Sequence, residues 1–156
     1  QFHVDETISQ PVVRPERKLF KLVQFGQRPA DMPLALFRAY WTGRYAQLAR
    51  TLPGLRGLVI NFRTPLDVMT HFFAPDSEGF TPDGVKRREH FYAQWDGMAE
   101  YWFDCAGDFA HARNSSAFAL LDELEKTLFD RVFYREVDET VAVLPKRDPA
   151  PEFYHR

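Results

Sequence analysis

The sequence predicts one domain of the α+β class, a ferredoxin-like β-α-β-β-α-β unit whose antiparallel sheet carries its helices on one face. Two observations favour this fold. Short runs rich in β-branched and aromatic residues indicate four strands, and two longer segments repeat their apolar residues at helical spacing. These segments follow one another in the order of the ferredoxin-like unit. A length of 156 residues is enough for one domain with its own core.

The first half of this unit is predicted to be a strand, a helix and a second strand. The apolar run LFKLVQF at 19–25 indicates the first strand. The helix is expected from about Pro33 to Arg50, and the LPG turn that follows ends it. Alternation over 55–62 indicates the second strand. The apolar face of the helix is formed by Phe37, Trp41, Tyr45, Leu48 and Leu52.

A long irregular stretch separates the second strand from the third. Residues 64–89 are rich in proline and glycine, and we expect them to pack over the site as a lid. The third strand is predicted over 90–104, with a break or bulge at the Asp96-Gly97 pair. This segment is rich in aromatic residues, so it is expected to line part of the core.

The last third of the domain is predicted to be helical and then extended. A short helix is expected over 107–113, a longer amphipathic helix over 115–130, and a final strand over 131–144. With both helices on one face of the sheet, the other face is left uncovered. Burying it against a second copy of the chain is the economical solution, so a homodimer is expected.

The two ends of the chain are predicted to lie outside the packed domain. Residues 1–17 are mostly polar and residues 145–156 contain three prolines, so both are interpreted as arms. The domain itself is expected to span residues 18–144.

Composition excludes several classes of function. The formal net charge of −2 gives no strong attraction for nucleic acid or an anionic membrane, and no apolar run approaches the about 20 residues that span a bilayer. Cys105 is the only cysteine, so no internal disulfide can form, and a cytoplasmic location is expected. No short-spaced histidine pair, cysteine cluster or phosphate-binding glycine loop occurs, so neither a metal nor a cofactor is predicted.

Several short motifs occur together in a characteristic order. They are Arg28-Pro29, Tyr40-Trp41, Leu52-Pro53-Gly54-Leu55, Asn61, Asp96-Gly97-Met98 and Phe129-Asp130. This set resembles the EthD-like branch of the dimeric α+β barrel proteins, over roughly residues 18–144. The resemblance implies a cavity between the helices and the sheet of each subunit. It also implies that the histidine of the family's first helix falls at Tyr45 here.

Four residues are the candidate catalytic groups. Tyr45 is on the predicted buried stripe, where it is either a proton donor or a core tyrosine with a satisfied hydroxyl. Asn61 could polarise a carbonyl, or pair with neighbouring backbone. His71, in the long loop, and His90, at the start of the predicted third strand, are candidate general bases near neutral pH. The residues expected to contact a substrate are Trp41, Arg63, Phe73, Trp95, Tyr101 and Trp102.

Two functional interpretations follow. The first is a cofactor-independent acid/base enzyme for a largely apolar, aromatic or polyketide-like small molecule, working as a cyclase, dehydratase or isomerase in a biosynthetic or catabolic pathway. An oxygen-using monooxygenase needs the same first proton transfer, so oxidation stays open. The second is a non-catalytic dimeric binding or accessory protein, which the loss of the helix-one histidine favours.

Overall fold

The computed structural model describes residues 4–12, 18–63 and 74–140. Its sheet has five antiparallel strands in the order β1-β3-β4-β2-β5. The strands are β1 (Val4–Gln10), β2 (Phe20–Gln27), β3 (Leu55–Arg63), β4 (Gly97–Phe103) and β5 (Arg131–Val137). Apart from β1, the order and connections are those of a ferredoxin-like unit, so the predicted fold class is confirmed.

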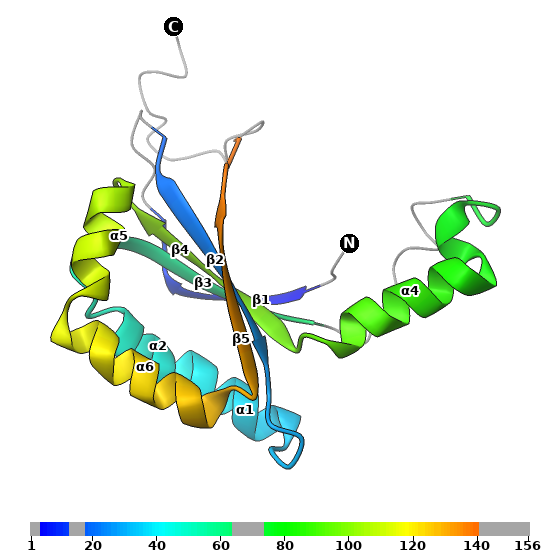
Figure 1. Cartoon of the computed structure of the whole chain (residues 1–156), viewed down its shortest axis with the longest axis horizontal. Helices are drawn as coiled ribbons and strands as arrows, with labels where there is room; N and C mark the ends of the chain where they lie inside the picture. The colour runs from blue at the N-terminus through cyan, green and yellow to red at the C-terminus, as the bar shows by residue number, and fades with distance from the viewer. Residues whose placement is uncertain (1–3, 13–17, 64–73, 141–156) are drawn as a thin grey trace, which may run out of the picture.

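The main helices pack together on one face of this sheet (Figure 1). They are α1 (Leu34–Tyr40), the π-helix η1 (Trp41–Tyr45), α2 (Ala46–Ala49), α5 (Ala106–Arg113) and α6 (Ser116–Leu128). The first three follow one another without a break, where the sequence predicts one helix. Helix α6 begins after Ser115, whose Oγ accepts a hydrogen bond from the Phe118 amide at 3.2 Å, an N-cap that satisfies one free donor of the first turn.

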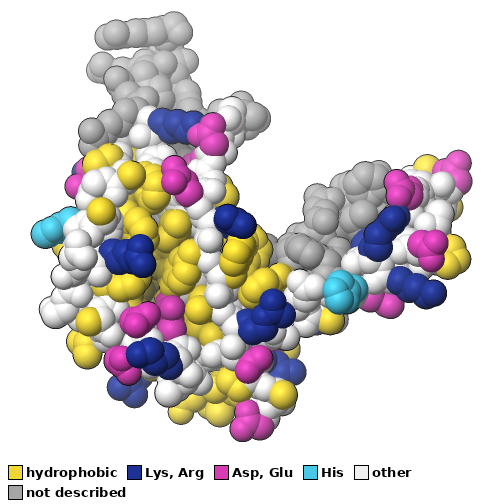
Figure 2. All heavy atoms as spheres, viewed as in Figure 1, with side chains coloured by type: hydrophobic (Ala, Val, Ile, Leu, Met, Phe, Trp, Pro, Cys, Tyr) yellow, Lys and Arg dark blue, Asp and Glu magenta, His cyan; other side chains and the backbone are white. Residues whose placement is uncertain are grey.

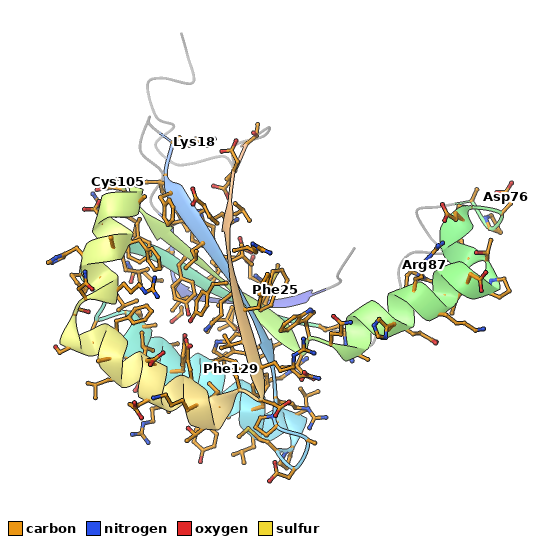
Figure 3. All side chains as sticks on the ribbon, viewed as in Figure 1. Lys18, Phe25, Asp76, Arg87, Cys105 and Phe129 are labelled. Atoms are coloured by element: carbon orange, nitrogen blue, oxygen red, sulfur yellow. The ribbon has the colours of Figure 1, made fainter. Side chains whose placement is uncertain are left out.

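An aromatic cluster joins the helices to the sheet. The ring of Phe129, which follows α6, packs edge-on against Trp41 with 4.8 Å between centroids, and against Phe37 at 5.8 Å. A Cβ added to Gly26 on β2 would lie 2.5 Å from Phe129 Cε1. Glycine at this position therefore allows Phe129 to rest on the strand backbone. Figure 3 places Phe129 between the helical layer and the sheet.

The predicted N-terminal arm contains a strand that the sequence did not indicate. Within residues 1–17, Val4–Gln10 form β1, which pairs antiparallel with β3 from Val4↔Arg63 to Gln10↔Leu58. The strand is polar and Ile8 is 58% exposed, so it shows no apolar pattern. Its formation depends on the unpaired backbone groups that β3 offers at its edge.

The predicted long loop and third strand also need correction. Residues 64–73 lie outside the described residues, but a 3-10 turn, η2 (Glu78–Phe80), and a helix, α4 (Pro82–Ala93), follow them. His90 is therefore on a helix, and the strand begins only at Gly97. Proline was interpreted as a loop signal, whereas Pro82 occupies the first helical turn, where its missing amide hydrogen costs nothing.

Helix α4 points away from the helical layer, so it does not cover that side of the molecule (Figure 1). Its Arg87 lies far out on this projecting segment, near Asp76 (Figure 3). No helix in the described ranges is both long enough and apolar enough to cross a bilayer.

The sheet face opposite the helices carries both apolar and charged side chains. Leu19, Val59 and Trp102 form a small buried cluster there. Beside it, Lys21 makes ion pairs with Glu100 and with Glu139, the latter at 2.9 Å. An aromatic group on the same face consists of Phe25, Trp95 and Phe133, with centroids 5.8–6.4 Å apart.

Candidate functional site

A pocket lies between the helices and the inner face of the sheet, where the resemblance implied a cavity. Its lining is mostly aromatic and aliphatic, and hydrophobic side chains gather in the hollow between α5–α6 and β5 (Figure 2). Its empty volume, including the space at the open mouth, is about 250 Å³. The lining residues are Leu22, Tyr45, Leu52, Tyr101, Phe103, Phe109, Phe118, Leu121 and Tyr134.

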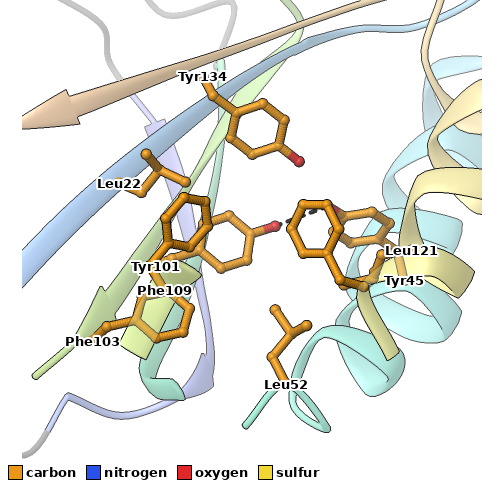
Figure 4. Close-up of a pocket in the computed structure, with 9 residues that line it drawn as sticks. Leu22, Tyr45, Leu52, Tyr101, Phe103, Phe109, Leu121 and Tyr134 are labelled. Atoms are coloured by element: carbon orange, nitrogen blue, oxygen red, sulfur yellow. Dashed lines mark hydrogen bonds between the residues drawn. The ribbon is translucent and has the colours of Figure 1, made fainter. Parts of the chain in front are cut away.

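Three tyrosines supply the polar part of this lining (Figure 4). Tyr45 is the last residue of the π-helix, Tyr101 is on β4 and Tyr134 is on the edge strand β5. A π-helix places one extra residue in a turn and commonly marks a functional site. Tyr45 is only 1% exposed, so its hydroxyl needs partners inside the protein.

Two more side chains complete a buried polar cluster with these tyrosines. Gln24 lies on β2, two residues after Leu22, so both side chains are on the same face of the sheet. Glu125 lies on the inner face of α6. We call Gln24, Tyr45, Tyr101, Glu125 and Tyr134 the tyrosine–glutamate cluster. Its members come from five different elements, so the cluster exists only when the whole domain is folded.

Hydrogen bonds converge on one oxygen of Glu125. Its Oε1 accepts from the Tyr45 hydroxyl at 2.6 Å, from Gln24 Nε2 at 2.8 Å and from the Tyr134 hydroxyl. No hydrogen bond within the described ranges uses Oε2 of this residue. Three donors on one oxygen orient the carboxyl group and leave the second oxygen available.

The tyrosine hydroxyls are also linked to one another through this cluster. The Tyr45 and Tyr101 oxygens are 3.0 Å apart, and the Tyr101 hydroxyl donates to Gln24 Oε1 at 3.1 Å. Gln24 Nε2 lies 2.8 Å from the Tyr45 oxygen and 2.7 Å from the Tyr134 oxygen. An amide group has two hydrogens, so it can serve only two of its three neighbours at once. The network can therefore rearrange without losing all its bonds.

Burial governs the protonation of the cluster. It raises the pKa of the Glu125 carboxyl, although hydrogen bonds from Tyr134, Tyr45 and Gln24 act in the opposite direction. It also raises the pKa of Tyr45, Tyr101 and Tyr134 above the ordinary value of tyrosine. At neutral pH the three phenols are hydrogen-bond donors, and the carboxyl takes a proton more readily than an exposed glutamate does.

Of the predicted site residues that the structure describes, Tyr45 and Tyr101 line this pocket. Trp41 is fully buried in the aromatic cluster with Phe129 and is core. His90 is exposed on α4 and its Nε2 lies 2.9 Å from Gln94 Nε2. His71 and Phe73 lie outside the described residues.

The other predicted residues are on the far side of the sheet or at its end. Asn61 is buried, but its Nδ2 donates to Glu100 at 2.9 Å on the face opposite the helices. Trp102 and Trp95 belong to the apolar groups of that same face. Arg63 ends β3, and its carbonyl oxygen accepts from Arg38 Nη2 at 3.0 Å. The structure therefore does not bring these residues to the pocket.

Three members of the cluster were not predicted from sequence, although each carried a signal. Gln24 is a polar residue inside an apolar strand, in phase with Leu22. Glu125 is four residues after Leu121 and three before Leu128, so helical spacing puts it on the buried stripe. Tyr134 follows the same alternation along β5. A polar residue on an apolar stripe was the pattern that identified Tyr45, and it applies equally to these residues.

No group of three histidine, cysteine, aspartate or glutamate side chains suited to a metal ion occurs in the part of the chain that the structure describes.

Comparison with known proteins agrees with this geometry. The EthD domain matches residues 29–131. The chain belongs to the EthD family. An EthD family protein of Bacillus halodurans has a similar fold, with a TM-score of 0.55 and 16% identity over 79% of this chain and 100% of that one. A hypothetical Arabidopsis thaliana protein gives a TM-score of 0.49 and 12% identity over 82% of this chain and 94% of that one. No curated protein matches the sequence.

Proposed function

We propose that this EthD protein is a cofactor-independent acid/base enzyme for a largely apolar, aromatic or polyketide-like small molecule. The observation that carries the proposal is the tyrosine–glutamate cluster beneath an aromatic pocket. Enzymes of this kind need hydrogen-bond donors where negative charge develops and a group that accepts or gives a proton. The phenols supply the donors, and the carboxyl of Glu125, whose pKa burial raises, exchanges the proton.

The pocket lining assigns different roles to the two kinds of group. Tyr45, Tyr101 and Tyr134 reach the pocket, so their hydroxyls can donate to a carbonyl or enolate oxygen of the substrate. Glu125 does not line the pocket and is bonded to Tyr45 and Tyr134 behind it. It therefore acts through a tyrosine: the phenol oxygen takes a proton from the substrate while its own proton passes to Oε1 of Glu125.

This arrangement supplies a proton acceptor in place of His90, one of the two histidines that the sequence suggested. His90 is exposed on the projecting helix α4 and is hydrogen-bonded to Gln94 instead of to the cluster. A tyrosine coupled to a buried carboxyl can perform the same proton transfer, because the carboxyl receives the proton that leaves the phenol. Enolisation next to a carbonyl is the first step of cyclisation with dehydration and of isomerisation, and oxidation by oxygen would begin in the same way.

A direct test uses 2-tetralone, a planar ketone with acidic C–H bonds, in heavy water. The wild-type protein should accelerate exchange of these hydrogens for deuterium, as followed by NMR. Tyr45→Phe removes one hydroxyl and keeps the ring, so exchange should slow about tenfold or more, which corresponds to about 1.4 kcal/mol. Stability should fall as well, by about 1–3 kcal/mol, because Gln24, Tyr101 and Glu125 each lose a buried hydrogen-bond partner.

Tyr40→Phe is the matched control, because Tyr40 is exposed on α1 and outside the pocket. It should leave exchange unchanged. Equal exchange rates for Tyr45→Phe and the wild type would remove Tyr45 from the mechanism. A wild-type protein that gives no acceleration would argue against the enzyme.

In that case the function would be non-catalytic small-molecule binding. One observation favours this second candidate: the three phenol hydroxyls already donate within the cluster, to Glu125 and to Gln24, so each has a partner without a substrate. Binding of 2-tetralone without exchange, seen as shifts of its NMR signals, would support it.

We also propose a homodimer formed through the sheet faces opposite the helices. Phe133 is 38% exposed there beside Phe25 and Trp95, an aromatic group that a second sheet would remove from water. Light scattering at micromolar concentration should give twice the mass of one chain, and Phe133→Asp should shift it towards the monomer. A wild-type protein that stays monomeric would contradict this.

A further inference from the structure

The polar part of the pocket consists only of hydroxyl groups that can donate. Tyr45, Tyr101 and Tyr134 come from three elements, and their oxygens meet at Gln24 Nε2 or at one another within 3.0 Å. Every other lining residue is apolar. These phenols now donate to oxygens of Glu125 and Gln24, and a ligand oxygen that accepts hydrogen bonds can take the place of those oxygens.

We propose that the pocket binds small phenols and enols as their oxyanions, and that the proton of the ligand moves to Glu125. This inference rests on the acid/base function proposed above and specifies its ligand class. An oxyanion is the strongest acceptor that such a site can hold, because bonds from neutral donors to a charged oxygen are stronger than bonds between neutral groups.

Because Glu125 lies so close to the pocket, the proton that the ligand loses has to stay within the tyrosine–glutamate cluster. Its Oε1 is bonded to Tyr45 and Tyr134, so a bound oxyanion would lie one phenol away from this carboxylate. Two negative charges so close together in a buried site strongly disfavour each other. A proton on Glu125 removes one of them, and burial already raises the pKa of this carboxyl.

In the described part of the chain, the groups that face Glu125 are phenols, one amide and one carboxylate. The π-helix contributes Tyr45, β4 contributes Tyr101, β5 contributes Tyr134 and β2 contributes the neutral Gln24. On α6 itself, Asp122 adds a negative charge that raises the pKa of Glu125 further. Among the described residues, no lysine, arginine or histidine contributes to the pKa shift of this carboxyl.

The transfer balances without a co-reactant. The ligand O–H gives its proton to the Tyr134 oxygen, and the Tyr134 O–H bond breaks as that proton moves to Oε1 of Glu125. The site then holds a ligand oxyanion, a neutral tyrosine and a neutral carboxylic acid. Tyr45 and Tyr134 donate to the new oxyanion in place of the carboxylate.

A single aromatic ring with one hydroxyl is the smallest ligand of the proposed class. The walls of the pocket include Phe103, Phe109 and Phe118. 4-Nitrophenol fits this description, and its neutral and ionised forms have different absorption bands. Nitrobenzene has the same ring and nitro group without the hydroxyl, so it serves as the apolar control.

Titration of wild-type protein with 4-nitrophenol, followed by absorption, tests the inference. One pH unit below the pKa of the free probe, bound 4-nitrophenol should show the phenolate band, and it should bind at least about tenfold more tightly than nitrobenzene. Above the pKa values of both the probe and Glu125, binding must take up one proton, so affinity should fall by up to about tenfold per pH unit.

Glu125→Gln separates this proton transfer from simple packing. The variant cannot accept the proton, so its bound probe should be neutral at low pH, and its affinity should rise to a plateau instead of falling at high pH. Glu123→Gln is the matched control, because Glu123 is exposed on the same helix and pairs with Lys126 at 2.6 Å. It should reproduce the wild-type profile.

Three results would overturn the inference. They are a neutral spectrum for the probe on wild-type protein, the same pH profile for wild type and Glu125→Gln, and no preference for 4-nitrophenol over nitrobenzene. If Glu125→Gln does not fold, calorimetry of the wild type in two buffers of different ionisation heat counts the protons taken up. Zero uptake at high pH also rejects the inference. Failure here with intact 2-tetralone exchange rejects the oxyanion site and leaves the acid/base function standing.

Discussion

Replacing Phe129 with alanine is expected to lower the free energy of unfolding by about 3–5 kcal/mol, the usual cost of removing a buried aromatic ring. Phe129 contacts Trp41, Phe37 and Tyr45, with ring centroids 4.8, 5.8 and 5.9 Å apart. It also fills the space directly above Gly26. The cavity would lie where α6 ends against the sheet, and the surrounding rings are too rigid to close it.

Urea or thermal unfolding measures this loss. Leu120→Ala is the control, since Leu120 is on α6 but 59% exposed, and its substitution should change stability by no more than about 0.5 kcal/mol. If Phe129→Ala costs as little as Leu120→Ala, the aromatic cluster does not hold the helices to the sheet as described.

The stability of the folded protein should also depend on pH through Glu125. Burial raises the pKa of this carboxyl above the about 4.3 of an unperturbed glutamate, so the folded state binds its proton more tightly than the unfolded state does. The stabilisation is fully present below the ordinary pKa and is lost as pH rises through the pKa in the folded protein. In that window the loss approaches at most about 1.4 kcal/mol per pH unit.

The difference between wild type and Glu125→Gln isolates this contribution, because the other carboxylates titrate in both proteins. The stability of the wild type relative to Glu125→Gln should fall as pH rises through the pKa of Glu125 in the folded protein. Any effect of the substitution that does not depend on pH adds only a constant to this difference. Glu123→Gln should show a constant difference over the same window, since its side chain is 71% exposed. A constant difference for Glu125→Gln would mean that its three hydrogen bonds offset burial, and a change in the opposite direction would mean that they outweigh it.

The fold could be predicted from sequence because its strands and helices have clear apolar patterns. The order of these elements along the chain is compatible with few strand orders in the sheet. The misread segments lacked this signal. Strand β1 is polar and depends on the edge of β3, a partner more than 40 residues away in the sequence. Helix α4 begins with Pro82 in a region rich in proline and glycine. This composition is typical of a loop, so the helix was not predicted.

The candidate site was predicted only where a polar residue was recognised on an apolar stripe. Tyr45 met this condition and Tyr101 was included as wall, whereas Gln24 and Glu125 were not recognised. Histidines were favoured because their ordinary pKa suits proton transfer. The pKa of Glu125 is raised by burial, which depends on the packing of α6 against the sheet and cannot be seen in a single residue.

The π-helix at Trp41–Tyr45 has a consequence for comparing this chain with its relatives. A π-turn holds one more residue than an α-turn, while the helical faces before and after it stay in place. A relative that is one residue shorter here can therefore keep both faces. Gly43 is where the extra residue is easiest to accommodate, because a Cβ there would meet no atom within 4 Å.

An alignment gap between such relatives consequently belongs inside residues 41–45. Its exact place decides whether Arg44 or Tyr45 is paired with a histidine of another sequence. Counting residues from Trp41 does not settle this pairing, since the count differs between a π-turn and an α-turn. The equivalent residue in a relative is therefore the one whose side chain contacts the positions of Gln24 and Glu125. In this chain that residue is Tyr45.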